Sequence, residues 1–288
     1  MIILLKNISK LTGLFLLLLL SFIYTDKVFS EARNNDPLMK EVINYKEKND
    51  VKPLEPTITG DEMVLGLSGL EVNEKESYEK MKQEDEFDKE KIVYDNTYPK
   101  TSISNNYDYY ITKGNNKKEN VSIIFKVSSS KNIDEILELI SQSNVPVNFF
   151  IDGLFLEKNV ETAFSMINLD CEIYNLGYGG KYDKSMISVT NNLIESITLK
   201  DSNLCLNENK NNSQKNICSK KKMLTITPTV INPDITKLKK ELDKGIMIVY
   251  DLSYFDYSNF NLIVNTITSR GYEIVGLSSL IKEEFLNI

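Results

Sequence analysis

Strand-like and helix-like segments alternate along residues 119–288, and this alternation constrains the fold more than any other feature of the sequence. Residues 121–127 and 145–151 are apolar, β-branched stretches typical of buried strands. Between them, over residues 133–140, isoleucine and leucine recur at helical spacing. Repeated strand–helix units pair their strands in parallel. The pattern therefore predicts an α/β domain, with a mostly parallel sheet that is covered by helices and is either open or closed into a barrel.

The segment at residues 1–30 has the layout of a secretory signal peptide. Lys6 and Lys10 precede an apolar run over residues 11–24, and Ser30 lies at a plausible cleavage site. The run is shorter than the ~20 residues that cross a bilayer as a helix, so export is favoured over retention as a membrane anchor. The protein is expected to be extracellular or at the cell surface, either secreted or anchored to the outer face of the cytoplasmic membrane.

Two further segments precede the α/β domain. Residues 31–60 are polar and contain proline, which predicts a flexible linker. Residues 61–118 differ, because Asn73 followed by Glu76 forms a capping box that opens a helix. We expect 61–118 to be a small α+β N-terminal extension and 119–288 to be the α/β domain.

Charge and cysteine content narrow the function classes. The net charge is −7, with lysine and glutamate interspersed, so nucleic acid is not an expected partner. Cys205 and Cys218 flank a polar loop at residues 207–217, and a disulfide between them is expected in an exported chain. Cys171 is interpreted as a small buried hydrophobic residue.

Several segments resemble, in their order and spacing, the polysaccharide deacetylase (NodB homology) family. Asn-Val-Pro-Val-Asn-Phe-Phe-Ile-Asp-Gly at residues 144–153 is similar to the second strand of that family. The apolar strand at 121–125, Cys-Glu-Ile-Tyr-Asn at 171–175 and Arg-Gly-Tyr-Glu-Ile-Val at 270–275 surround it in the family's order. The resemblance implies a distorted (β/α) barrel and, in active members, metal-dependent hydrolysis of acetylated glycans.

The positions that carry chemistry in that family are all changed. Lys126 and Val127 stand where a first strand ending in Thr-Phe-Asp-Asp supplies the general base and a metal ligand. Leu176 and Gly180 stand where two histidines bind the metal, and Tyr250 stands where a histidine acts as general acid. The chain contains no histidine at all. An ammonium or an isopropyl group cannot accept a proton or hold a cation, so the resemblance implies a degenerate site with no catalytic residues, no metal and no cofactor.

Tyrosines remain near the expected strand ends, where folds of this class place their sites. The ligand-binding candidates are Asn175, Tyr178, Tyr182, Tyr250 and Tyr254. A tyrosine offers a flat apolar face and a hydroxyl group, a combination suited to sugar rings. The alternative, that some of these rings fill space left by the metal and its ligands, stays open at this point.

Two hypotheses follow from different classes. The first is an exported, non-catalytic protein that binds a cell-envelope glycan or an envelope protein and meets the membrane only through its N-terminal segment. The second is a carbohydrate deacetylase, hydrolysing C–N amide bonds in acetylated glycans, with a rebuilt site of acidic residues such as Asp152, Asp183, Asp251 and Asp256. The absence of histidine favours the first hypothesis.

Overall fold

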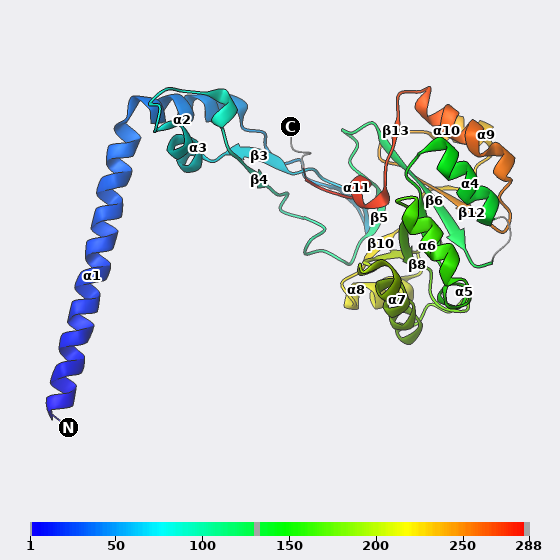
Figure 1. Ribbon diagram of the computed structural model, residues 1–288, viewed down its shortest axis with the longest axis horizontal. Helices are drawn as coiled ribbons and strands as arrows, with labels where there is room; N and C mark the ends of the chain where they lie inside the picture. The colour runs from blue at the N-terminus through cyan, green and yellow to red at the C-terminus, as the bar shows by residue number, and fades with distance from the viewer. Residues whose placement is uncertain (1, 130–132, 285–288) are drawn as a thin grey trace. The chain divides into compact units, whose positions relative to one another are not determined.

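The computed structural model describes residues 2–129 and 133–284, and the chain divides into two compact units (Figure 1). One unit comprises Met1–Lys52 and Gly69–Thr97, and the other comprises Pro53–Ser68 and Tyr98–Ile288. The expected boundary between an extension at 61–118 and a domain at 119–288 is therefore wrong. Part of the extension belongs to the larger unit because its strands join the main sheet.

The smaller unit is built from helices and one pair of antiparallel strands. Helices α1 (Ile2–Asn35), α2 (Pro37–Asn49) and α3 (Glu74–Met81) are accompanied by the antiparallel strands β3 (Gly69–Val72) and β4 (Tyr94–Thr97) and by the 3-10 turn η1 (Lys89–Lys91). Its small core consists of Leu38, Met39, Val42, Val72, Tyr78 and Met81.

The helix α2 corrects the flexible linker expected over residues 31–60. Asp36 caps this helix by accepting a hydrogen bond from the backbone N–H of Leu38, and Pro37 occupies the first helical turn. Helix α3 agrees with the sequence, since the Asn73 side chain accepts a hydrogen bond of 2.9 Å from the N–H of Glu76.

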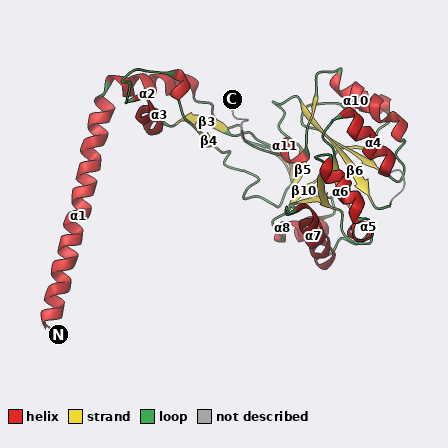
Figure 2. Cartoon of the chain, in the orientation of Figure 1, coloured by secondary structure: helices red, strands yellow, loops and turns green. Residues whose placement is uncertain are grey.

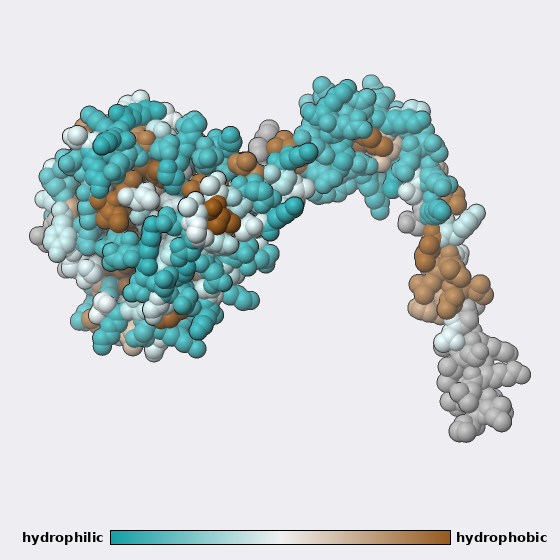
Figure 3. All heavy atoms as spheres, turned by 180° about the vertical axis from the view of Figure 1, so that it is seen from behind, coloured by the Kyte–Doolittle hydropathy of each residue, from teal (hydrophilic) through white to brown (hydrophobic). Residues whose placement is uncertain are grey.

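Helix α1 carries the apolar run that the sequence placed in a signal or anchor segment. Its described side chains from Phe15 to Leu20, together with Phe22, Ile23 and Phe29, are exposed and form the apolar band on this helix in Figure 3. Within the described residues, we find no helix with both the length and the apolar character needed to cross a membrane.

The larger unit is organised around one curled, mixed sheet of eleven strands. The strand order is β1-β2-β5-β10-β9-β8-β7-β6-β12-β11, with β13 paired to β6, and every neighbouring pair is parallel except β1 with β2. The strands are β1 (Thr57–Thr59), β2 (Glu62–Val64), β5 (Tyr110–Lys113), β6 (Asn120–Val127), β7 (Asn148–Ile151), β8 (Glu172–Asn175), β9 (Leu204–Leu206), β10 (Leu224–Ile226), β11 (Val230–Ile231), β12 (Met247–Asp251) and β13 (Glu273–Ile274).

The mostly parallel α/β architecture is thus confirmed, whereas the closed form of the barrel is not. In the described residues, β1 and β11 form the two ends of the strand order and do not pair with each other. The sheet is therefore a curled half-barrel.

Helices surround the strands of this unit, as Figure 2 shows. They are α4 (Ile133–Ser143), α5 (Gly153–Lys158), α6 (Val160–Asn168), α7 (Lys184–Thr198), α8 (Asn212–Lys220), α9 (Ile235–Glu241), the 3-10 turn η2 (Tyr257–Asn259), α10 (Phe260–Thr268) and the short α11 (Leu277–Leu280). The helical spacing over residues 133–140 corresponds to α4, and the strand expected over 121–127 corresponds to β6.

Alternating side chains of each strand enter two different cores. On β6, Phe125 and Val127 belong to the helix-side core with α4 and α10 residues, whereas Ile124 belongs to the inner core that α11 covers. A strand sends successive side chains to opposite faces of its sheet. The face on which a residue lies therefore decides whether it can reach the concave side, where a barrel of this class holds its site.

The disulfide expected from the sequence is confirmed. Cys205 of β9 is bonded to Cys218 of α8, and Cys171 is free and buried. The segment between the bonded cysteines was expected to be a loop, but it includes most of α8. Burial, assisted by the charges of Asp170 and Glu172, raises the pKa of the Cys171 thiol to about 12, so this thiol is unreactive at neutral pH.

Candidate functional site

The strand ends that would hold the site contain an ion cluster. Lys126, at the end of β6, lies opposite Asp251 of β12 in the strand register. Its ammonium nitrogen Nζ lies 2.9 Å from Oε2 of Glu208 and 3.4 Å from Oδ2 of Asp251. Glu208 lies just beyond β9, so the Lys126 ammonium group pairs with carboxylates from the ends of two other strands, β9 and β12. We call these three residues the central ion cluster.

The central ion cluster is largely shielded from solvent. The side chains of Lys126, Glu208 and Asp251 are each about one-fifth exposed. Burial alone would lower the pKa of Lys126, but the hydrogen bond to Glu208 and the charges of Glu208 and Asp251 outweigh it and raise that pKa above its usual value. Lys126 therefore remains a cation across the physiological range.

One oxygen of the central ion cluster is unsatisfied. Oε1 of Glu208 is buried and has no hydrogen-bond partner among the described residues. Asp251, by contrast, accepts a hydrogen bond of 3.0 Å from the N–H of Ser253, and its own N–H donates to Asn232. The cluster is thus held by charge attraction at Lys126 and by loop hydrogen bonds at Asp251.

The structure separates the five positions that the sequence placed in a degenerate site. Lys126 and Leu176 lie on the inner side of the sheet, since Leu176 packs against the inner core. Val127 is fully buried in the helix-side core. Gly180 lies in an exposed turn.

Tyr250 was expected to stand in the place of the acid, and this prediction is wrong. Its ring lies in the helix-side core, 4.9 Å from the ring of Phe255 and 6.0 Å from that of Phe125, measured between centroids. Asp251, the next residue, is the β12 side chain that reaches the centre. On this strand, Asp251 and not Tyr250 therefore faces the concave centre.

A divalent metal does not fit the residues at this centre. Such an ion needs several anionic or neutral donor atoms, and here an ammonium group already lies between the two carboxylates. Among the residues that the structure describes, no group of three or more His, Cys, Asp or Glu could hold a metal ion. Both carboxylates at this centre are paired with the ammonium group of Lys126.

The other aspartates considered for a rebuilt site cap helices. Asp152 caps α5, Asp183 caps α7 and Asp256 caps η2, each by accepting hydrogen bonds from backbone N–H groups. These three carboxylates are therefore engaged in holding helix starts. Only Asp251 lies at the centre, and it is paired with Lys126.

Asp152 also fixes the glycine-bearing loop after β8. In addition to the N–H groups of Leu154 and Phe155, its carboxylate accepts hydrogen bonds from the N–H groups of Gly179 at 3.0 Å and Gly180 at 2.9 Å. Gly177 begins this loop with φ of +80°, and a side chain there would meet a backbone oxygen at 2.3 Å. The loop is therefore a built structural element.

Three of the ligand-binding candidates use their polar groups inside the protein. Asn175 is fully buried, donates to the carbonyl of Ile187 at 2.8 Å and accepts from the N–H of Gly177 at 2.6 Å. Tyr182 donates its hydroxyl to the carbonyl of Asn175 at 2.9 Å. Tyr178 donates to Glu157 at 2.5 Å. The hydroxyl groups of these tyrosines are therefore engaged, and that of Tyr182 braces the strand end.

The remaining two candidates do come together. Tyr250 and Tyr254 line one pocket of about 430 Å³ on the helix side, between the segment that leads into α9 and the residues that follow β12. The tyrosines that follow β8, Tyr178 and Tyr182, do not line this pocket. The ligand-binding candidates therefore do not gather in one cleft.

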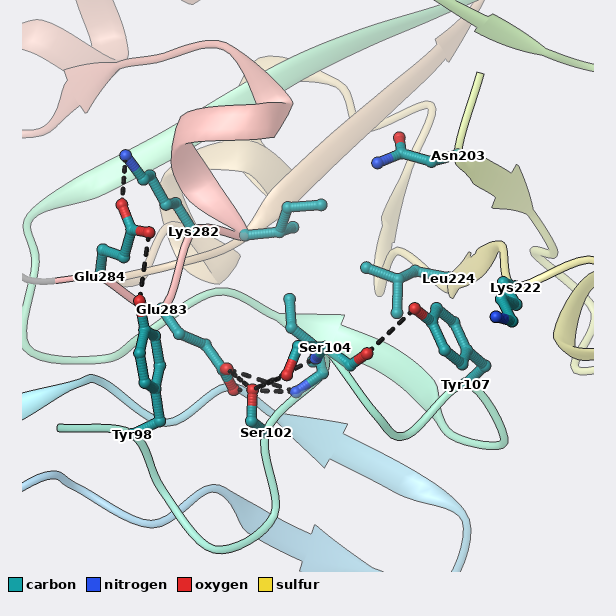
Figure 4. A pocket seen from close by; sticks show the side chains of 12 residues that line it. Tyr98, Ser102, Ser104, Tyr107, Asn203, Lys222, Leu224, Lys282, Glu283 and Glu284 are labelled. Atoms are coloured by element: carbon teal, nitrogen blue, oxygen red, sulfur yellow. Dashed lines mark hydrogen bonds and ion pairs between the residues drawn. The ribbon is translucent and has the colours of Figure 1, made fainter. Parts of the chain in front are cut away.

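A second pocket, of about 540 Å³, lies where β9 and β10 begin (Figure 4). Sequence reasoning did not find it, because it depends on Glu283, a carboxylate that is only 6% exposed. Glu283 accepts a hydrogen bond from Ser102 at 2.5 Å, while Lys282 pairs with Glu284. Burial raises the pKa of Glu283, although the hydrogen bonds from Ser102 and Ile103 oppose this. These polar groups already satisfy one another.

The fold has clear counterparts among solved structures. Wild-type BA3943 of Bacillus anthracis, described as a pseudoenzyme of carbohydrate esterase family 4, superposes with a TM-score of 0.66 at 18% identity, over 88% of this chain and 97% of that one. A BA3943 mutant described as having restored enzymatic activity superposes with the same TM-score at 17% identity, over 86% and 99% of the two chains. The chain therefore has the polysaccharide deacetylase fold.

Another protein described as a carbohydrate esterase shares the same fold. PdaA of Bacillus subtilis, described as a family 4 carbohydrate esterase, superposes with a TM-score of 0.52 at 14% identity, over 62% of this chain and 87% of that one. In sequence, the uncharacterized protein YlxY of Bacillus subtilis is 29% identical over 147 residues, which is 50% of this chain. The match spans 46% of YlxY, about half of its length. No family model matches the chain.

Proposed function

Because the chain has the polysaccharide deacetylase fold with an ammonium group at its centre, we propose that it is an exported, non-catalytic protein that binds a component of the cell envelope. The proposal has two parts. The first is the loss of amide hydrolysis, and the second is a binding role outside the cytoplasmic membrane.

The observation that carries the first part is the central ion cluster. Metal-assisted hydrolysis needs a cation that polarises water and a base that takes its proton. At this centre, Lys126 supplies a fixed positive charge that repels a metal ion, and it occupies the carboxylate of Asp251 and one oxygen of Glu208. The chain contains no histidine that could act as ligand or general acid.

Comparison with solved structures supports the same interpretation. BA3943, whose fold resembles that of this chain over nearly its whole length, is described as a pseudoenzyme. At 18% identity the likeness concerns the fold alone, so the argument for lost activity depends on the residues of this chain. The mutant of BA3943 with restored activity indicates that such a frame can support chemistry when suitable groups are present.

Two features support an exported location. Lysines precede an apolar run whose described side chains are exposed on α1, as in a signal or anchor segment. The Cys205–Cys218 disulfide is typical of proteins that work in an oxidising compartment. A protein with this fold outside the membrane would meet the glycans and proteins of the envelope.

Activity measurements test the first part. Purified protein, incubated with an acetylated chitin or peptidoglycan oligomer and with Zn²⁺, Mn²⁺, Co²⁺ or Mg²⁺ in turn, should release no acetate. Bc1960, a protein of the same fold that is described as a peptidoglycan N-acetylglucosamine deacetylase, serves as the positive control. Acetate release above the level of a heat-inactivated sample, abolished by Asp251→Asn, would show a rebuilt hydrolase and end the proposal.

Binding measurements test the second part. We expect the protein to remain on purified cell-wall polymer during washing at physiological salt, or to retain an envelope protein in a pull-down from a membrane-and-wall fraction. Absence of both kinds of retention would contradict a binding role while leaving the loss of catalysis intact.

A further inference from the structure

The pocket of about 430 Å³ beside β12 has features of a ligand site that the central ion cluster lacks. Its volume is within the range of small-molecule sites in proteins. It lies on the helix side of the sheet, lined by Tyr250 and Tyr254 and by the polar side chains of Asn232, Asp234 and Asp256. It is therefore distinct from the concave centre where the deacetylase fold holds a metal.

The hydroxyl of Tyr250 has no partner in the free protein. Tyr250 is 4% exposed, and its hydroxyl oxygen is buried without a hydrogen-bond partner among the described residues. The Tyr250 ring packs against the rings of Phe125 and Phe255, with centroids 6.0 Å and 4.9 Å away. Buried polar groups almost always have a hydrogen-bond partner. A ligand that enters the pocket lined by Tyr250 would supply the partner that its hydroxyl lacks.

The hydroxyl is also held in its neutral form. Burial, and then the negative charge of Asp234, raise the pKa of Tyr250 well above its usual value. A neutral phenol can both donate and accept a hydrogen bond. It is thus suited to a hydroxyl group or a ring oxygen of a ligand.

The walls and rim of the pocket limit the chemistry of the ligand. Tyr254 is 86% exposed and offers a flat aromatic face, while the buried Phe255 forms part of the inner wall of the pocket. The residues that line the pocket include the carboxylates of Asp234 and Asp256 but no lysine or arginine. An anionic ligand would be repelled, whereas a cationic group would be attracted.

We propose that this pocket binds a pyranose that carries a free amino group, as in a de-N-acetylated glycan of the cell envelope. The aromatic face contacts the apolar face of the sugar ring, the Tyr250 hydroxyl bonds a sugar oxygen, and Asp234 and Asp256 face the ammonium group. This inference rests on the binding role proposed above and names the ligand class and the site for it.

Calorimetric titration of the full chain with three oligomers of equal length tests the ligand class. The probes are a glucosamine oligomer, its N-acetylated form and a glucose oligomer without nitrogen. We expect the glucosamine oligomer to bind tightest. Asp234→Asn with Asp256→Asn should remove this preference while leaving weak binding of the glucose oligomer. Equal or tighter binding of the acetylated oligomer would overturn the assignment of an amino sugar.

Variants at the tyrosines test the site. Tyr254→Ala should weaken glucosamine-oligomer binding by about tenfold, the effect of losing one aromatic contact. Tyr178→Ala, which removes a half-buried tyrosine outside the pocket, is the control and should bind as the wild type does. Equal losses in both variants, or a loss in neither, would overturn the assignment of the site.

Tyr250→Phe removes one oxygen atom and separates a binding role from a structural one. We expect weaker oligomer binding and no loss of thermal stability, because the hydroxyl has no partner in the free protein. A lower unfolding temperature with unchanged binding would show that the hydroxyl is bonded within the protein, and would overturn the proposal. Retention of wild-type protein on cell-wall polymer, if it persists in Tyr254→Ala, would leave the binding role standing and reject only this pocket.

Discussion

Tyr250 and Asp251 are consecutive residues of β12, yet they serve opposite sides of the sheet. The Asp251 carboxylate lies 3.4 Å from the ammonium nitrogen of Lys126 at the concave centre. The ring of Tyr250 lies 4.9 Å from that of Phe255 and borders the helix-side pocket. At this strand end, Asp251 pairs with Lys126 at the concave centre, and Tyr250 lines a separate pocket on the helix side.

Replacing Lys126 by methionine should destabilise the protein. Lys126→Met keeps much of the side-chain volume but leaves Glu208 and Asp251 facing each other without a cation. Removing one partner of a fully buried pair costs about 3–5 kcal/mol, and since these side chains are about one-fifth exposed we expect a smaller loss of about 1–3 kcal/mol. Denaturant unfolding at neutral pH measures it.

A surface pair provides the control for that experiment. Lys244→Met breaks the ion pair with Glu119, whose side chain is 54% exposed, and should destabilise the protein much less than Lys126→Met does, because exposed ion pairs contribute little to stability. The raised pKa of Lys126 adds a pH test. The stabilisation by Lys126 should be complete below about pH 10.4 and lost as the pH rises through its higher folded-state pKa. Equal losses in the two variants would contradict a special role for the central ion cluster.

Replacing Lys126 by aspartate should convert the cluster into a cation-binding site. Lys126→Asp would bring three carboxylates together, and hard divalent cations prefer such oxygen ligands. We expect the variant to be less stable than wild type in chelator and to regain stability in millimolar Ca²⁺ or Mn²⁺, as followed by thermal unfolding. A cation effect of the same size in Lys126→Met would show that the cation binds elsewhere.

The disulfide should contribute substantially to stability. Cys205 and Cys218 are 13 residues apart, and closing a loop of that size contributes about 3 kcal/mol in the chain-entropy model. The double variant Cys205→Ala with Cys218→Ala should lose about this amount in denaturant unfolding. Dithiothreitol should destabilise the wild type to a similar extent and leave the double variant unaffected, whereas no effect on the wild type would contradict the bond.

Glu283 should make stability depend on pH in the acidic range. Because burial raises its pKa, the folded state favours the protonated form. The stabilisation from this group is then complete below about pH 4.3 and is lost as the pH rises through its folded-state pKa. Glu283→Gln mimics the protonated form, so the stability of wild type relative to this variant should fall between about pH 4 and pH 7. A constant difference over that range would contradict the assignment.

The sequence predicted the parallel α/β architecture because the strands and helices of the larger unit have strong local patterns. The apolar stretch of β6 and the helical spacing in α4 are both recognisable without tertiary information. The disulfide was predictable from two cysteines around a polar segment. The helix α2 was missed, although Asp36 followed by Pro37 is a usual helix start.

The site was less predictable for a physical reason. Residues 246–250, at and before β12, are uninterrupted apolar residues, because strands of parallel sheets are buried on both faces. Such a run has no alternation that shows which residues point inward. The sequence therefore did not indicate that Asp251, and not Tyr250, faces the centre. Glu208 could not be found at all, since only the fold brings it to Lys126.

The central ion cluster has a consequence for the conditions under which the protein can work. In a metalloenzyme, the carboxylates that bind the metal repel one another when the metal is absent. Here the chain itself supplies the cation, because Lys126 lies between the carboxylates of Glu208 and Asp251 and offsets part of their repulsion without an added ion. The stability of the folded state should therefore not depend on the supply of transition metals around the cell.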